Sequence, residues 1–316
     1  MPTEPTAGPP HIVILMAVYN GADHLDEQLE SFAAQTHTDW QLLASDDASR
    51  DGSRVVIERF AGTAGHTVCL DGPALGGTEN FMSLIRAMPA HAPDGSWLAF
   101  SDQDDVWLPD RLQRGIAALQ KTAPDQPALY CSRTWITNET LGERRLSVPR
   151  PKPLGFRNAL VQNVASGNTI LLNAAAARLV QDAASEATCP VVHDWWVYQL
   201  VSGAGGVLVH GDTPSLLYRQ HEVNQIGAND TIRAKILRMA MLLSGTFRDW
   251  NDVNIAVLGR SAHRLTPQNR QLLEAFDALR GKGLVGRLKG LKRLGLYRQS
   301  RSSTMALWLA VFLGRL

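Results

Sequence analysis

Three carboxylates crowd into four positions in the run Ser101-Asp-Gln-Asp-Asp-Val-Trp107. Asp102, Asp104 and Asp105 repel one another unless a cation lies between them. Mg²⁺ or Mn²⁺ would serve, because these hard cations prefer carboxylate oxygens and keep coordination sites for phosphate. An Asp-x-Asp pair would therefore bridge through the metal to a diphosphate. The alternative is a solvated acidic turn in which Asp104 or Asp105 caps the next helix.

A second acidic pair, Asp46 and Asp47, follows an apolar segment. A carboxylate there would accept the imide N–H of a uracil or thymine ring, or bond a ribose hydroxyl. The alternative is that residues 45–53 form a polar loop that caps the following helix. The run Ala17-Val-Tyr-Asn-Gly21 predicts a strand that ends in a tight turn, where backbone groups would reach a base.

Two later motifs suggest a base and further ligands. In His193-Asp-Trp-Trp196, a carboxylate at a helix start lies between aromatic residues, and partial desolvation would raise the pKa of Asp194 toward that of a general base. The alternative is a helix cap beside core tryptophans. In Tyr218-Arg-Gln-His221, Arg219 would clamp phosphate and His221 would supply a nitrogen ligand to the metal. The alternative is a structural histidine.

The elements that would position these residues alternate along the chain. Apolar runs predict strands over 11–18, 40–44, 67–70 and 96–101. Helical spacing predicts helices over 23–34, from 51 onward, over 78–88 and over 109–120. Four such alternations predict an open α/β sheet, whose ligands bind beyond the carboxyl ends of the strands. The polar motifs therefore gather where this fold would place a ligand.

The rest of the chain continues this pattern and then changes character. We expect strands over 128–135, 169–172, 205–210 and 215–218, and helices over 174–183 and 193–201. Residues 138–158 predict a loop over the site, residues 1–10 a flexible tail, and residues from 231 onward a helical and increasingly basic region.

Composition narrows the function classes. The 316 residues carry a net charge of +1, which argues against a nucleic-acid partner. The three cysteines include no C-x-x-C pair, so they exclude a zinc ribbon and fit a reducing compartment. Neither a G-x-G-x-x-G nor a P-loop motif occurs, which argues against a dinucleotide-binding dehydrogenase and a P-loop ATPase. With neither a signal peptide nor a membrane-spanning run, we expect a cytoplasmic protein.

Taken in order, the motifs resemble the family 2 glycosyltransferases, which have the GT-A fold. The resemblance covers residues 11–230 and is most specific at 101–107 followed by Pro109, at 193–196 and at 219–227. These runs look like the rhamnosyltransferase-like branch that acts on bacterial surface polysaccharides. The resemblance implies a Rossmann-like open mixed sheet flanked by helices, with a catalytic domain over 11–230 and a helical extension over 231–316.

The resemblance also implies roles for individual residues. The donor would be a nucleotide-diphospho-sugar, and the product would have inverted anomeric configuration. The predicted donor-binding residues are Ala17, Tyr19, Asn20, Asp46, Asp47, Asn80, Asp102 and Arg219. The predicted ligands of Mg²⁺ or Mn²⁺ are Asp102, Asp104, Asp105 and His221, and the predicted catalytic base is Asp194.

The donor and the acceptor are less constrained. The branch favours dTDP-rhamnose, with UDP-sugars second, and a glycan or lipid-linked saccharide as acceptor. The turn Ala-Val-Tyr-Asn at 17–20 departs from the Pro-Thr-Tyr-Asn of many family members. A sugar nucleotidyltransferase is one rival, but residues 19–23 lack its Gly-rich, Arg-containing loop. A non-catalytic carbohydrate- or nucleotide-binding module is the other rival, and it would need no base at Asp194.

The last segment, residues 281–316, contains eight Lys or Arg and no Asp or Glu. Apolar residues share a helical face over 284–295, and the run 305–313 is wholly apolar. A basic amphipathic segment of this kind predicts peripheral contact with an anionic membrane at the inner face of the plasma membrane. The alternative is that the apolar face packs on the catalytic domain or on a second copy in a homodimer.

Overall fold

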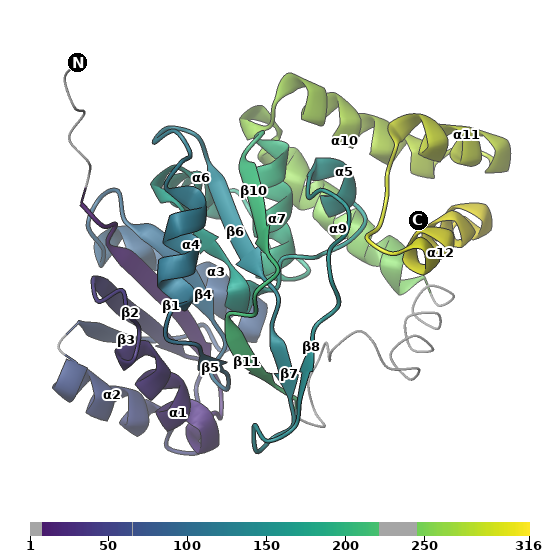
Figure 1. Cartoon of the computed structure of the whole chain (residues 1–316). Helices are drawn as coiled ribbons and strands as arrows, with labels where there is room; N and C mark the ends of the chain where they lie inside the picture. Colours follow the sequence, from purple (N-terminus) through teal and green to yellow (C-terminus); the bar gives the residue numbers. More distant parts are fainter. Residues whose placement is uncertain (1–7, 65, 221–244) are drawn as a thin grey trace.

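The structure is a computed structural model that describes residues 8–64, 66–220 and 245–316. Its main sheet has seven strands in the order β10-β6-β9-β4-β1-β2-β3 (Figure 1). The strands are β1 (Ile12–Val18), β2 (Trp40–Asp46), β3 (Thr67–Asp71), β4 (Trp97–Ser101), β6 (Ala128–Ser132), β9 (Leu171–Leu172) and β10 (Val207–Gly211). Strands β1 to β4 run parallel, whereas β9 is antiparallel to both of its neighbours. The sheet is therefore mixed.

The register of the parallel strands brings their carboxyl ends to one edge. Val18 pairs with Asp46, Asp46 pairs with Asp71, and Met16 pairs with Ser101. The carboxyl ends of β1 to β4 therefore lie within a residue or two of one another along the sheet edge, and the polar motifs begin there. This confirms the predicted meeting of the strand ends.

A smaller sheet continues from this edge, in the order β5-β11-β7-β8. Its strands are β5 (Val106–Trp107), β7 (Trp135–Thr137), β8 (Arg144–Leu146) and β11 (Leu216–Arg219). Residues 102–105 connect β4 of the large sheet with β5 of the small one. The acidic run thus lies at the junction of the two sheets.

Three predictions for this region were wrong in detail. The strand expected over 128–135 divides into two, because β6 pairs with β10 in the large sheet up to Ser132, whereas β7 pairs with β11 in the small sheet from Trp135. The loop expected over 138–158 contains β8 and the short helix α5 (Phe156–Ala159). The strand expected over 169–172 is only β9, after a 3₁₀ turn over Gly167–Thr169.

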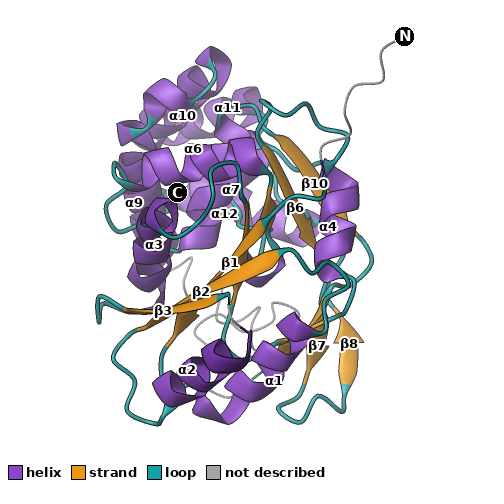
Figure 2. Ribbon diagram, turned by 90° about the vertical axis from the view of Figure 1, so that its left-hand side faces the viewer, coloured by secondary structure: helices purple, strands orange, loops and turns teal. Residues whose placement is uncertain are grey.

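Helices cover both faces of the large sheet (Figure 2). One face packs on α1 (Ala22–Ala33), α2 (Ser53–Ala64) and α4 (Arg111–Leu119), and the other packs on α3 (Gly77–Ala87), α6 (Ala174–Ala184) and α7 (His193–Gly203). Within β1, Ile14 belongs to the first side and Leu15 to the second. Successive strand side chains point to opposite faces, so a run that is apolar at every position suits this central strand.

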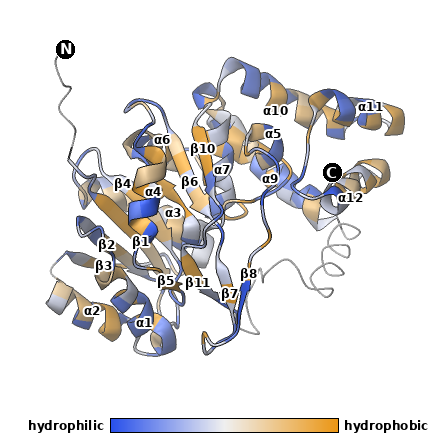
Figure 3. Cartoon of the chain, in the orientation of Figure 1, coloured by the Kyte–Doolittle hydropathy of each residue, from blue (hydrophilic) through white to orange (hydrophobic). Residues whose placement is uncertain are grey.

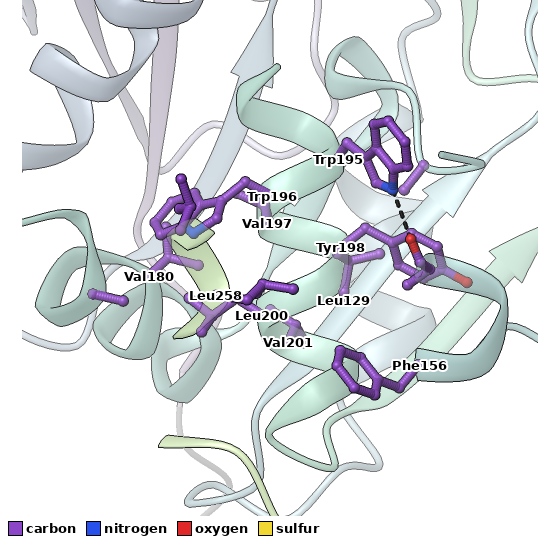
Figure 4. Close-up of a cluster of buried hydrophobic side chains, with 14 of the residues drawn as sticks. Leu129, Phe156, Val180, Trp195, Trp196, Val197, Tyr198, Leu200, Val201 and Leu258 are labelled. Carbon is purple, nitrogen blue, oxygen red and sulfur yellow. Dashed lines mark hydrogen bonds between the residues drawn. The ribbon is translucent and has the colours of Figure 1, made fainter. Parts of the chain in front are cut away.

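The helices after residue 245 join the same core. They are α9 (Thr246–Arg260), α10 (Pro267–Arg280), α11 (Leu284–Leu294) and α12 (Arg301–Leu313). Their buried residues, Phe276 and Leu307 among them, share one cluster with α7. Figure 4 shows Leu258 of α9 in this cluster, with Trp196 and Leu200 of α7. The expected boundary at residue 230 lies outside the described residues, as do residues 1–7 of the expected tail. No helix in the described ranges is long and apolar enough to span a bilayer.

Candidate active site

The turn after β1 is fastened to the acidic run by one side chain, Gln103. Its Oε1 accepts the N–H of Tyr19 (2.7 Å), and its Nε2 donates to the Tyr19 carbonyl (3.1 Å). Gly21 makes this approach possible, because a Cβ at that position would lie 2.5 Å from Gln103 Cδ. The half-buried Ala17 and the exposed Tyr19 ring therefore stand beside residues 102–105. The predicted base-binding turn and metal-binding run form one unit.

Asn20 joins the same turn to the loop after β2. It adopts a left-handed backbone conformation (φ 47°), which asparagine tolerates better than most residues. Its N–H donates to Ser49 Oγ (2.9 Å), and its Oδ1 accepts the N–H of Arg50 (2.9 Å). Its side-chain oxygen thus links two loops of the protein.

Asp46 and Asp47 are both buried at the end of β2. Asp47 accepts the N–H groups of Ala74 (2.6 Å) and Gly76 (2.8 Å), one on each carboxylate oxygen. Among the residues that the structure describes, the Asp46 side chain accepts one hydrogen bond, a long one from the Ser49 N–H (3.3 Å). Asp47 therefore shapes the loop before α3, and Asp46 keeps more of its hydrogen-bonding capacity.

Asn80, on α3, lies beneath this loop and is almost fully buried. Its Nδ2 donates to the Ser45 carbonyl (3.0 Å), which ties α3 to the end of β2. Its Oδ1 has no hydrogen-bond partner among the described residues. Asn80 therefore stands at the predicted donor-binding edge with one unused acceptor.

Asp102, Asp104 and Asp194 come together although more than ninety positions separate the first from the last. Burial, with the charges of Asp104 and Asp194, raises the pKa of Asp102 to about 7. The pKa of Tyr218, on β11, is also raised, by burial and by the charges of these carboxylates and of Asp105. Coulomb interactions weaken with distance, so charges that shift a pKa lie near the group they act on. The acidic run and the start of α7 therefore lie near one another and near Tyr218.

Asp194 lies in the first turn of α7 and is held on both oxygens. Oδ1 accepts hydrogen bonds from Asn163 Nδ2 (2.9 Å) and the Trp195 N–H (2.6 Å), and Oδ2 accepts the N–H of Gly167 (3.0 Å). Burial raises the pKa of Asp194 to about 6, against these hydrogen bonds, which lower it. A carboxylate with this pKa is ionised at neutral pH and is still a useful base.

His193 precedes the predicted base and stays neutral. Its ring stacks on Phe81 with centroids 3.8 Å apart, and burial lowers its pKa to about 3. Its Nε2 has no hydrogen-bond partner within the described part of the chain. A Cβ at residue 167 would lie 2.8 Å from that nitrogen, so Gly167 lets the backbone pass between the ring and Asp194.

Asp105 and Arg219 are used within the protein. Asp105 is fully buried, and its oxygens accept Asn168 Nδ2 (2.6 Å) and the Arg219 N–H (3.2 Å). The Arg219 side chain is also buried, donates to the Asp104 carbonyl (2.9 Å) and pairs with Glu27. These contacts hold the acidic run in place from beneath. They differ from the metal and phosphate contacts that the sequence predicts for the two side chains.

The fourth predicted metal ligand, His221, lies outside the described residues. Across 8–64, 66–220 and 245–316, no three His, Cys, Asp or Glu side chains gather closely enough to hold a metal by themselves. Asp102 and Asp104 are therefore the two predicted ligands left at this edge. A cation there would complete its coordination with other groups, such as substrate phosphates and water.

Sequence reasoning missed Gln103 and Asn163. Gln103 occupies the middle of the Asp-x-Asp run, where only the outer carboxylates attract notice. Asn163 lies in a segment without periodicity, and only the fold brings it to Asp194.

The fold is that of the GT-A glycosyltransferases. TarS residues 1–349 from S. aureus, solved with UDP-GlcNAc, superimposes with a TM-score of 0.54 over 96% of this chain and 88% of that one, at 11% identity. The mannosyltransferase PcManGT from Pyrobaculum calidifontis, solved with GDP-Man and Mn²⁺, gives a TM-score of 0.50 over 98% and 87%, at 15% identity. These likenesses confirm the predicted fold.

The chain belongs to glycosyl transferase family 2, whose profile matches residues 13–177. It is 27% identical over 241 residues to the dTDP-rhamnosyl transferase RfbG of Shigella flexneri, across 74% of this chain and 81% of that protein. The predicted family and the predicted enzyme class are thereby confirmed. A non-catalytic module and a sugar nucleotidyltransferase are set aside.

Proposed function

We propose that this enzyme is an inverting, metal-dependent transferase that moves a sugar from a nucleotide-diphospho-sugar to a hydroxyl of a glycan or lipid-linked saccharide. One observation carries the proposal: Asp102 is buried beside the charges of Asp104, in the same loop, and of Asp194, on α7, and these raise its pKa. A carboxylate pair beside a base of raised pKa is what the transfer requires.

The residues present fit a divalent cation. Asp102 is hard to ionise because it is buried and because Asp104 and Asp194 are charged nearby. Carboxylate oxygens are the ligands that Mg²⁺ and Mn²⁺ prefer, and these ions commonly complete their coordination with substrate phosphates and water. Asp102 and Asp104 would hold the ion, with His221 a further proposed ligand. When bound, the ion neutralises charge that builds on the departing diphosphate.

Asp194 is the proposed catalytic base. It takes the proton from the acceptor hydroxyl as that oxygen attacks the anomeric carbon opposite the departing diphosphate. Direct displacement inverts the configuration and forms no covalent intermediate on the enzyme. Asn163 and Gly167 hold the carboxylate in one orientation while it waits for the proton. Asp105 and Arg219 act as positioning residues that hold the acidic run in place.

The proposed base-binding surface lies between the ends of β1 and β2. Ala17, Tyr19 and Asn20 line one side, and Asp46, Asp47 and Asn80 line the other. The 27% identity to RfbG, which is called a dTDP-rhamnosyl transferase, favours dTDP-rhamnose as the donor. A UDP-sugar is the second candidate, since TarS was solved with UDP-GlcNAc.

A saccharide carried on a lipid would place the reaction beside a membrane. We therefore propose bacterial surface polysaccharide synthesis as the process and the cytoplasmic side of the plasma membrane as the place. A homodimer is the alternative use of residues 281–316.

The central experiment combines Asp194→Asn with a panel of nucleotide-sugars. Nucleotide release by the unaltered enzyme should need Mg²⁺ or Mn²⁺ and stop with a chelator. Asp194→Asn should abolish turnover, because an amide cannot take the proton, yet donor binding measured by calorimetry should persist. Asp26→Asn is the matched control, because Asp26 is exposed and paired only with Arg59. Near-normal turnover of Asp194→Asn would refute the assignment of the base.

A further inference from the structure

Helix α12 has apolar side chains on two opposite faces. Leu307, Ala310 and Val311 are buried against the core. On the other face, Met305 is 73% exposed and Phe312 54%, with Trp308, Leu309 and Leu313 also exposed. A helix that lies on a protein surface normally turns polar residues outward. The outward face of α12 is apolar instead, and Figure 3 shows most of this helix in the hydrophobic colour.

The first turn of α11 extends this exposed face. Arg287 Nε donates to the carbonyl of Val311 (3.0 Å), so the start of α11 lies beside the end of α12. Leu284 and Val285, in that first turn, are exposed as well. We call these exposed side chains of α11 and α12 the outer apolar patch. Its side chains come from two neighbouring helices, at the end of the molecule opposite α1 and α2 (Figure 1).

Cations border the outer apolar patch. Arg301 begins α12 and is exposed one turn before Met305, and the exposed Lys282 and Arg315 flank the junction of the two helices. Acidic side chains are absent from residues 281–316. In the recess of about 350 Å³ beside Arg287, two acids are present, Asp252 and Asp277, and both pair with Arg280. The border of the patch is therefore positive.

We propose that the outer apolar patch inserts into an anionic lipid bilayer. Apolar side chains with a cationic border match the acyl region and the headgroups of such a surface. A second copy of the chain fits poorly, because a two-fold interface would set the same cations against each other. The inference names the surface by which the proposed function would reach a lipid-linked acceptor. Its test measures binding to vesicles and does not depend on turnover, so it can fail while the proposed function holds.

The patch is rigidly linked to the site. Gln299, just before α12, donates its N–H to Gln162 Oε1 (2.8 Å), and the neighbouring Asn163 holds Asp194. Asn158 Nδ2 also donates to the Tyr297 carbonyl (3.0 Å). Docking through α12 would therefore fix the height and direction of Asp194 relative to the membrane.

Flotation of the full chain tests the proposal with vesicles of phosphatidylglycerol and phosphatidylcholine, against phosphatidylcholine alone. The protein should float only with the anionic vesicles. Phe312→Asp should weaken binding at least about tenfold, because it removes apolar area and adds an anion. Val55→Asp on α2 is the matched control: Val55 is equally apolar and exposed but lies at the other end of the molecule, so this variant should float normally.

A second variant guards against misfolding. Arg301→Glu should weaken binding about thirtyfold at low salt, since it reverses one charge at the surface. Glutamate at the first position of a helix is favourable for the helix, so α12 should persist. Failure of the unaltered protein to float, or normal flotation of both variants, would overturn the proposal. So would light scattering that shows a dimer which Phe312→Asp splits while no vesicles bind.

Discussion

Asp194 combines a raised pKa with three hydrogen bonds, so its ionisation should control the rate. The base works only when ionised, and its pKa is about 6. We therefore expect kcat/KM to be level above that pH and to fall about tenfold per unit below it. Saturating Mn²⁺ should be present, because a bound cation keeps Asp102 ionised. A profile that stays level down to about pH 5 would contradict this role.

Gln103 makes two hydrogen bonds that join the β1 turn to the acidic run. Gln103→Leu removes both, at about 1 kcal/mol each. We expect donor affinity, measured by calorimetry with metal, to fall about tenfold while the fold persists. Gln126→Leu is the matched control, since Gln126 also bonds a loop carbonyl, that of Gly205 (3.0 Å), away from the site. Equal affinities for both variants would show that the link is irrelevant to the donor.

The segment between α5 and β9 supports the base through Asn163. Its amide N–H stabilises the ionised form of Asp194, so Asn163→Ala should raise the pKa of the base by about one unit and lower kcat at neutral pH. Donor affinity should stay the same. An unshifted pH profile would refute this positioning role.

An element could be predicted from the sequence when its own residues carry the signal, and not when it forms through contacts with distant segments. The apolar runs of β1, β2 and β4 carry their own signal, because a central strand is buried on both faces. β9 has two residues, too few for any period, and exists because β4 and β6 pair with it. The contacts of Asp105 and Arg219 likewise depend on Asn168 and Glu27, which no local pattern connects to them.

The catalytic elements and the C-terminal helices share one core, which should make them unfold together. Leu307 of α12 is fully buried in that cluster, so Leu307→Ala should cost about 2–5 kcal/mol and lower the melting temperature of the whole chain. Met305→Ala, on the exposed side of the same helix, should change stability by less than about 0.5 kcal/mol. Calorimetry should record one transition for each protein. Two separated transitions would show that the helices form an independent unit.

The basic segment 281–316 has a consequence for the approach to a charged surface. Eight cations lie there in a chain whose total charge is +1, so the remaining residues are net acidic. Such a molecule is an electric dipole, and the field of a negative surface exerts a torque that turns its basic end forward before any contact is made. The torque acts over a Debye length of about 8 Å in physiological salt. Encounters would therefore begin with residues 281–316 already turned toward the surface. Added salt would screen the field, and the orientation at first contact would then be random.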